Sequence, residues 1–197
     1  MSTLATPGEE VGFEDFLVHY DGYFAEWIDG RAWMEDLSDL RRARLKRFLC
    51  TILHIWSSER DLGEMYVAPL TVRLNERVAL EPDLFFVRAA NQARVRYNYV
   101  DGPPDLVIEI VSRGARANTR QRVRWYESAG VPELWLIDAD RQGAEVLRLD
   151  GAGRYAAVDA SADLASEALG GLRIPTRWLW QQPLPRLTEV QKAWGLI

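Results

Sequence analysis

Glu109 stands in the stretch "PDLVIEIVS", where the apolar residues around it are typical of a buried β-strand. Side chains alternate along a strand, so Glu109 shares one face with Val107 and Val111. A buried, ionised carboxylate without a partner costs several kcal/mol. We therefore expect Glu109 to bind a metal ion at a cleft or to pair with one of the many arginines, and the strand by itself does not distinguish the two.

A second carboxylate, Asp83, stands in a similar setting. In "EPDLFFV" it follows Pro82 and precedes an apolar strand, as Asp105 does in the Glu109 segment. If the two strands are neighbours, Asp83 lies near Glu109. Two carboxylates at one sheet end suit a hard cation such as Mg²⁺ or Mn²⁺. The simpler interpretation of each Pro-Asp pair is a turn residue at the start of a strand, and we favour it for Asp105.

Other chemistry has few candidate residues. Lys46 and Lys192 are the two lysines among 24 basic residues, His19 and His54 are the two histidines, and Cys50 is the one cysteine. An internal disulfide and a cysteine-based zinc site are therefore excluded. The sequence also has no G-x-G-x-x-G fingerprint, Walker-type loop or serine elbow.

Composition and charge indicate an ordinary globular protein. The 197 residues are 48% hydrophobic and 27% charged, which predicts one domain, with residues 1–12 as a loose lead-in. We expect no membrane span, no secretory signal and a cytoplasmic location. The net charge of −5 argues against a basic surface over the whole protein but permits a local one.

Hydrophobic periodicity predicts an α/β domain with a central mixed β-sheet flanked by α-helices. The Asp29-Gly30 pair predicts a hairpin, and Asn118 is expected to cap the last long helix, which ends before Gly130. Helices are expected over residues 13–20, 38–57 and 118–129. Strands are expected over residues 24–28, 32–34, 65–74, 84–87, 106–111, 133–138, 144–149 and 154–159.

Four segments in this order resemble the Uma2 family, restriction-endonuclease-like proteins of the PD-(D/E)XK nuclease superfamily. They are "AEWIDGRAW", "EPDLFFV", "PPDLVIEIVS" and "YESAGVPELWLID", which together span residues 25–138. The resemblance implies a restriction-endonuclease-like core and a metal-dependent DNA endonuclease. It implies that Asp83 and Glu109 bind Mg²⁺ (or Mn²⁺) and that Glu26 is an accessory acid. A homodimer is compatible with such an activity.

The sequence departs from this family at the helix that follows Glu109. The family places a lysine four residues before the tyrosine that is Tyr126 here, and this chain has Arg122 instead. Arginine keeps the positive charge and can bind a phosphate, but it does not lose its proton near neutral pH. We expect Arg122 to take the lysine's place with a reduced or lost activity.

Two further alternatives stay open. Arg113, Arg116, Arg120 and Arg124 surround the expected site and either bind a phosphate backbone or form a solvated helix face. The protein is either a DNA endonuclease or a non-catalytic descendant that binds nucleic acid or a protein partner. In the second case, we expect Arg122 to form a salt bridge with Glu109.

Overall fold

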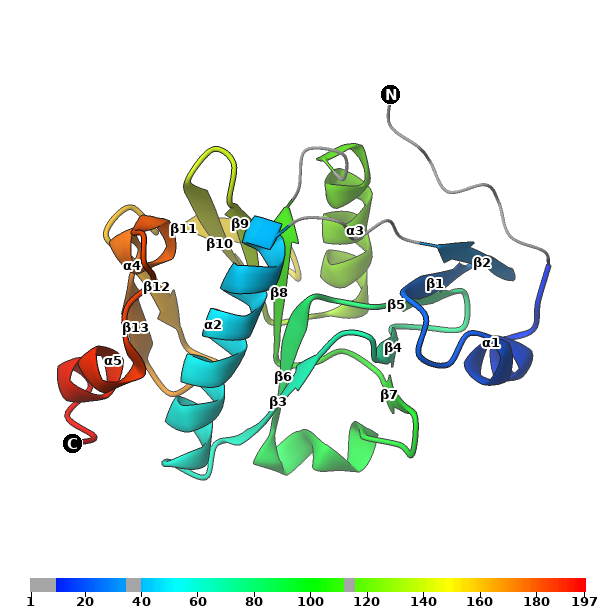
Figure 1. The fold of residues 1–197 in the computed structure, drawn as a ribbon. Helices are drawn as coiled ribbons and strands as arrows, with labels where there is room; N and C mark the ends of the chain where they lie inside the picture. Colours follow the sequence, from blue (N-terminus) through cyan, green and yellow to red (C-terminus); the bar gives the residue numbers. More distant parts are fainter. Residues whose placement is uncertain (1–9, 35–39, 112–115) are drawn as a thin grey trace.

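The computed structural model describes residues 10–34, 40–111 and 116–197, with side chains described from Thr119 onward in the last range. Its centre is a six-stranded mixed sheet in the order β11-β10-β9-β8-β6-β3 (Figure 1). Strands β8 and β9 are parallel, and their other neighbours run antiparallel. These strands are β3 (Gly63–Val67), β6 (Leu84–Arg88), β8 (Leu106–Val111), β9 (Glu133–Asp138), β10 (Gly143–Leu149) and β11 (Tyr155–Val158).

A second sheet has five strands in the order β2-β1-β5-β4-β7 and carries α1 (Phe13–His19). Its strands are β1 (Ala25–Ile28), β2 (Arg31–Met34), β4 (Thr71–Arg73), β5 (Val78–Leu80) and β7 (Tyr99–Asp101). Asp29 and Gly30 both have positive φ, which is the backbone of a two-residue hairpin turn. The predicted hairpin is confirmed.

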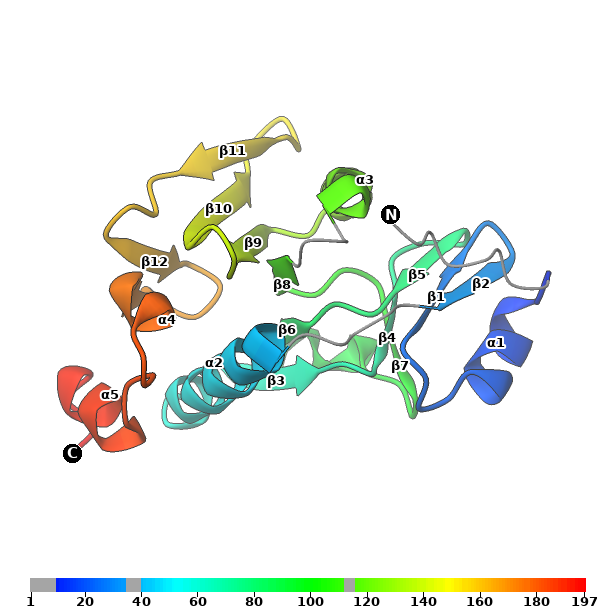
Figure 2. The ribbon, with the colours of Figure 1, turned by 45° about the horizontal axis from the view of Figure 1, so that its top comes forward.

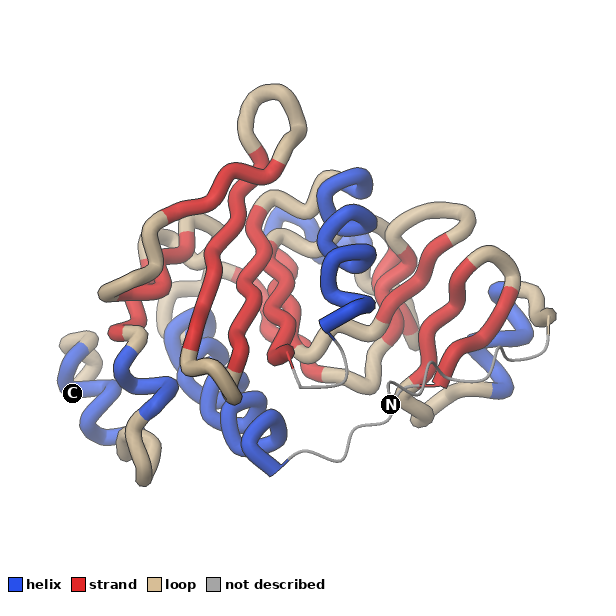
Figure 3. Tube along the Cα trace, turned by 90° about the horizontal axis from the view of Figure 1, so that it is seen from above, coloured by secondary structure: helices blue, strands red, loops and turns tan. Residues whose placement is uncertain are grey.

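Two long helices, α2 (Leu40–Ser58) and α3 (Arg116–Ala129), cover opposite faces of the six-stranded sheet (Figures 2 and 3). Ile108 packs in a core cluster with α2, whereas Val107 packs in a cluster with Tyr126 of α3. Because both faces are covered, β6 and β8 are apolar on both sides, as buried central strands are. Glu109 shares the face of Val107, toward α3.

The C-terminal part packs beside α2. It contains β12 (Asp163–Ser166), β13 (Leu172–Pro175), α4 (Arg177–Trp180) and α5 (Leu187–Ala193). The remaining element of the described chain, the 3₁₀ helix η1 (Ala89–Arg94), follows β6. The rings of Trp56 and Trp194 meet edge to face with centroids 5.1 Å apart. Trp56 Nε1 also donates to the carbonyl of Leu169 at 2.9 Å. Trp194 of the C-terminal part therefore packs against α2.

The structure corrects two of the expected elements. The single strand expected over residues 65–74 is two strands, β3 and β4, which belong to different sheets. Helix α3 begins at Arg116, so Asn118 lies inside it and is not its cap. At the other end, Gly130 has φ +80° and the Val131 amide donates to the Tyr126 carbonyl, as in a Schellman ending. Ser38, where the helix expected over residues 38–57 begins, lies outside the described residues.

In the described part of the chain, no helix combines the length and the apolar character that a membrane crossing requires.

Candidate functional site

Asp83 stands directly before β6 and lies beside β8, the strand that carries Glu109. The two strands pair antiparallel from Leu84 opposite Ile108, and the Ile110 amide of β8 donates to the Asp83 carboxylate. Asp83 is 1% exposed and Glu109 is 6% exposed. The condition set by the sequence, that the two strands be neighbours, is therefore met. Both carboxylates are buried deeply enough to need cationic or hydrogen-bonding partners.

Helix α2 supplies the cations at Asp83. Arg42 Nε lies 3.1 Å from both oxygens of the carboxylate, and Arg42 Nη2 lies 3.0 Å from Oδ1. Lys46 Nζ lies 3.3 Å from the same Oδ1. The Ile110 amide donates to Oδ2 at 2.9 Å, which ties Asp83 to the strand of Glu109. Asp83 is thus held by two positive charges and one backbone donor.

Helix α3 supplies the partners of Glu109. Arg122 donates to Glu109 Oε1 through Nη2 at 2.7 Å and through Nε at 3.1 Å. The Tyr126 hydroxyl, one turn further along α3, donates to the same oxygen. Arg122 and Tyr126 lie four residues apart and therefore project from the same face of the helix.

Arg122 also connects Glu109 to the five-stranded sheet. Its Nη1 forms an ion pair with Glu26 of β1, and its Nη2 donates to the Glu81 carbonyl at 3.2 Å. Glu81 is also buried, and one of its carboxylate oxygens accepts a bond from the Ala25 amide at 3.3 Å. The guanidinium therefore bridges a helix, the central sheet and the hairpin that carries Glu26.

Burial perturbs two weak acids at this site. It raises the pKa of the Tyr126 hydroxyl well above its usual value; the Arg122 charge opposes this rise and Glu109 adds to it. Tyr126 therefore stays protonated and donates to Glu109. Burial also raises the pKa of the Cys50 thiol, while the nearby charge of Lys46 lowers it.

Most of the site residues expected from the sequence are brought together. Arg122 contacts both Glu26 and Glu109, and Asp83 lies beside the strand that carries Glu109. Asp105 accepts bonds from the Arg88 amide and the Asn91 side chain, both at 2.8 Å, so its carboxylate has a structural role at the β6–η1 turn and not at the start of its own strand.

The four arginines expected to bind nucleic acid are only partly described. Arg120 and Arg124 are exposed on α3. Arg113 lies outside the described residues, and so does the side chain of Arg116, although α3 includes its backbone. The two described arginines are therefore open to solvent on the helix that carries Arg122.

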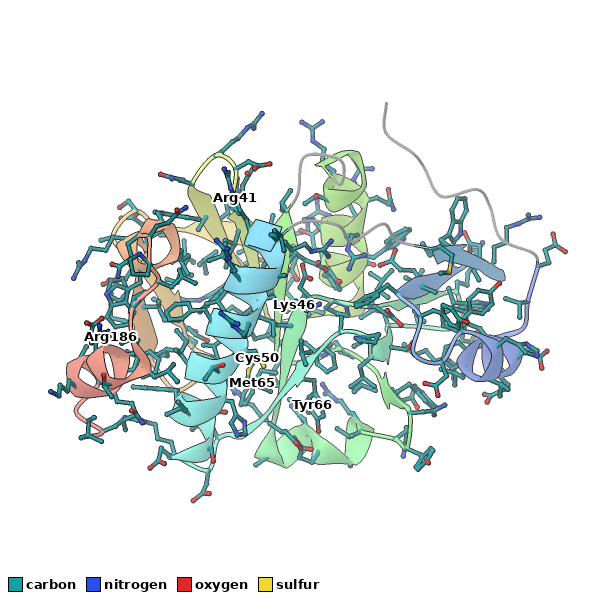
Figure 4. All side chains as sticks on the ribbon, viewed as in Figure 1. Arg41, Lys46, Cys50, Met65, Tyr66 and Arg186 are labelled. Atoms are coloured by element: carbon teal, nitrogen blue, oxygen red, sulfur yellow. The ribbon has the colours of Figure 1, made fainter. Side chains whose placement is uncertain are left out.

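The ion pair between Lys46 and Asp83 is not predicted from the sequence, although the sequence shows that the first half of this helix is basic. Figure 4 labels Arg41 and Lys46 on α2, on the side of the sheet opposite α3. The one available signal is that Lys46 follows Arg42 by four residues, so the two share a helix face. Helical periodicity does not reveal that this face meets Asp83.

The residues fit Mg²⁺ by donor chemistry. This ion is commonly bound through one or two carboxylates, with water and substrate phosphate as its other ligands. Among the described residues, no three or more acidic, histidine or cysteine side chains form a group that could hold a metal ion. A metal ion at Asp83 and Glu109 would thus have two protein carboxylates as ligands. At Glu109 it would compete with the Arg122 guanidinium, which already binds that carboxylate.

Comparison with known proteins gives the family. The family model of Uma2, described as "putative restriction endonuclease", matches residues 13–177, which is most of the chain. The chain belongs to the Uma2 family. No curated protein matches this Uma2 chain.

A crystal structure from Anabaena variabilis ATCC 29413, described as a "putative nuclease belonging to DUF820", has the same fold as this Uma2 chain. The two superpose with a TM-score of 0.65 at 16% identity, over 79% of this chain and 89% of the other. At this identity the likeness establishes the fold. The predicted restriction-endonuclease-like architecture, with a mixed sheet flanked by helices, is confirmed.

Proposed function

We propose that this Uma2 protein hydrolyses phosphodiester bonds of DNA with Mg²⁺ (or Mn²⁺) held by Asp83 and Glu109, and that Arg122 limits this activity. The observation that carries the proposal is the pair of buried carboxylates on neighbouring strands. Membership in a family described as restriction endonucleases supports it. A bound divalent cation supplies Lewis-acid polarisation of the phosphate and a more acidic water.

The cationic side chains have distinct roles in this proposal. Lys46 and Arg42 approach Asp83 from α2, and Arg122 approaches Glu109 from α3. Their positive charges stabilise the negative charge that builds up on a phosphate during hydrolysis. The Tyr126 hydroxyl orients the Glu109 carboxylate, and Glu26 orients the Arg122 guanidinium.

Arg122 limits the activity because it competes for Glu109. Its two donors to Oε1 take up the negative charge that would attract a metal ion. Arginine also stays protonated near neutral pH, so Arg122 is not available as a general base. Metal binding at Glu109 requires this ion pair to loosen.

A second function is favoured by the same ion pair. Arg122 forms ion pairs with Glu109 and Glu26 and so gives both buried carboxylates a cationic partner without any metal. In this alternative, the protein binds DNA or a protein partner on the nuclease scaffold and does not cut. The exposed Arg120 and Arg124 would then serve binding alone.

The test combines metal binding with DNA cleavage. We expect calorimetry with Mn²⁺ to show binding to the wild type and loss of binding in Glu109→Gln. Supercoiled plasmid with Mg²⁺ or Mn²⁺ should be nicked by the wild type and left intact by the Asp83→Ala/Glu109→Ala double variant. Equal nicking by both proteins rejects this site. Duplex DNA binding by the wild type, without metal binding or nicking, supports the second function.

A further inference from the structure

A groove of about 870 Å³ lies between the first half of α2 and the segment that runs from α4 to α5. It lies across α2 from Asp83, because one flank of α2 presents Arg42 and Lys46 to Asp83 and the other flank lines the groove with residues of the same turns. None of the contacts described above for Asp83 and Glu109 involves a residue that lines the groove.

One wall of the groove carries a row of arginines. Arg41, Arg44 and Arg47 follow one another at three-residue spacing, which places them along one side of the helix. All three are exposed, and Arg41 lies 3.4 Å from Asp140. No carboxylate in the described ranges forms an ion pair with Arg44 or Arg47. The wall therefore carries positive charge that the described part of the protein does not neutralise, although the net charge of the chain is −5.

The opposite wall is aromatic and amide-bearing. Trp180 is partly buried there, and Gln181 and Gln182 follow it and are exposed. Leu45 and Phe48 of α2 also line the groove and are buried. A row of cations opposite an aromatic ring and amide groups is the combination that holds single strands, through the phosphates on one side and an unpaired base on the other.

We propose that this groove binds single-stranded nucleic acid, with its phosphates on Arg44 and Arg47 and a base against Trp180. The inference rests on the proposed function only in taking nucleic acid as the ligand, and it adds a binding track across α2 from the carboxylates. A base can stack on a tryptophan only when it is unpaired, so the groove selects single strands over duplex. A bound strand runs along one flank of α2, and the opposite flank carries Arg42 and Lys46 to Asp83.

The experiment measures binding of fluorescent dT15 and rU15 by anisotropy between 50 and 200 mM salt. The variant Arg44→Ala/Arg47→Ala removes two phosphate contacts. Because each contact to a single strand contributes about 0.7 to the slope of log K against log salt, we expect the slope to become less negative by about 1.4. Trp180→Leu should weaken binding roughly 5- to 150-fold, the loss of one stacked base, and leave the slope unchanged.

The matched control is Arg77→Ala/Arg96→Ala, which removes the same charge from exposed loops next to the five-stranded sheet. It should leave both affinity and slope unchanged. The inference is overturned if the control and the groove variant weaken binding equally, or if the wild type binds neither oligonucleotide. In both cases plasmid nicking that depends on Asp83 still decides the proposed function separately. Binding of dT15 alone or of rU15 alone identifies the strand that the groove accepts.

Discussion

The Arg122 guanidinium lies 2.7 Å from Oε1 of Glu109 and reaches Glu26 with its other terminal nitrogen. One side chain thus forms ion pairs with two buried carboxylates that lie in different sheets. Arg122 is therefore a structural bridge at the centre of the candidate site. We therefore expect substitutions of Arg122 to affect the stability of the fold and the DNA cleavage activity in different ways.

Replacing Arg122 by lysine is expected to increase DNA cleavage. A lysine cannot donate two hydrogen bonds from a planar head to Glu109, so the carboxylate becomes more available to Mg²⁺. We expect the rate of plasmid nicking to rise by about tenfold or more, together with tighter Mn²⁺ binding in calorimetry. The control is Arg122→Lys combined with Glu109→Gln, which should not nick. A folded Arg122→Lys protein that cuts no faster than wild type contradicts competition between Arg122 and the metal.

Removing the charge at position 122 is expected to destabilise the fold. Arg122→Met leaves Glu26 and Glu109 buried without their shared cation, and breaking a buried ion pair in this way costs about 3–5 kcal/mol. Urea unfolding followed by circular dichroism measures this loss. Arg124→Met, on the exposed face of the same helix, is the matched control and should change the unfolding free energy by about 0.5 kcal/mol or less. Similar losses in the two variants would show that the buried pairing contributes little.

Cys50 offers a chemical test of where Lys46 lies. The positive charge of Lys46 lowers the pKa of the Cys50 thiol and thereby opposes the effect of burial. Lys46→Met should raise that pKa, reduce the thiolate fraction and slow labelling by a disulfide reagent at pH 8. Cys50 is the single cysteine, so the signal is unambiguous. Lys192→Met should not change the rate, and a rate in Lys46→Met equal to wild type would place the ammonium away from Cys50.

Tyr126 is expected to make stability fall at alkaline pH. Its pKa in the folded protein is raised above the ordinary value, chiefly by burial. The unfolded chain therefore loses the tyrosine proton first, so this stabilisation is complete below about pH 10 and declines at higher pH. Tyr126→Phe should cost about 1–3 kcal/mol at pH 7, because Glu109 loses a donor, and should flatten part of the alkaline decline. Urea titrations at pH 7 and pH 10.5 measure both effects, and an unchanged decline would assign it to other groups.

Glu133 is expected to hold the C-terminal part to the central sheet. It is 2% exposed, accepts bonds from Trp135 Nε1 at 2.8 Å and the Glu167 amide at 2.9 Å, and lies 3.5 Å from Arg148 Nε. Glu133→Ala should lower the unfolding free energy by about 1–3 kcal/mol, because the Trp135 indole and the Glu167 amide lose their buried acceptor, whereas Arg148 keeps Glu167 as a partner. Thermal unfolding measures this. Glu145→Ala, on the neighbouring strand β10, is a surface control, and equal losses would reject the role of Glu133.

The sequence by itself determined the chemical character of the site. A carboxylate inside an apolar strand must find a partner, so the sequence points to Glu109 and offers a metal ion or an arginine as that partner. The repeated Pro-Asp pattern points to Asp83, which lies beside the strand of Glu109 in the structure. Local patterns are sufficient here because burial costs and turn preferences act over a few residues.

Only the tertiary structure decided how the charges are distributed. Glu26 and Arg122 are ninety-six residues apart in the chain and meet because β1 and α3 lie beside the same strands. Asp83 receives its cations from α2 and Glu109 receives its cation from α3, on opposite faces of one sheet. The same packing splits residues 65–74 between two sheets and forms the groove beside α2. Such contacts follow from how whole elements pack, and no local spacing encodes which helix face meets which strand.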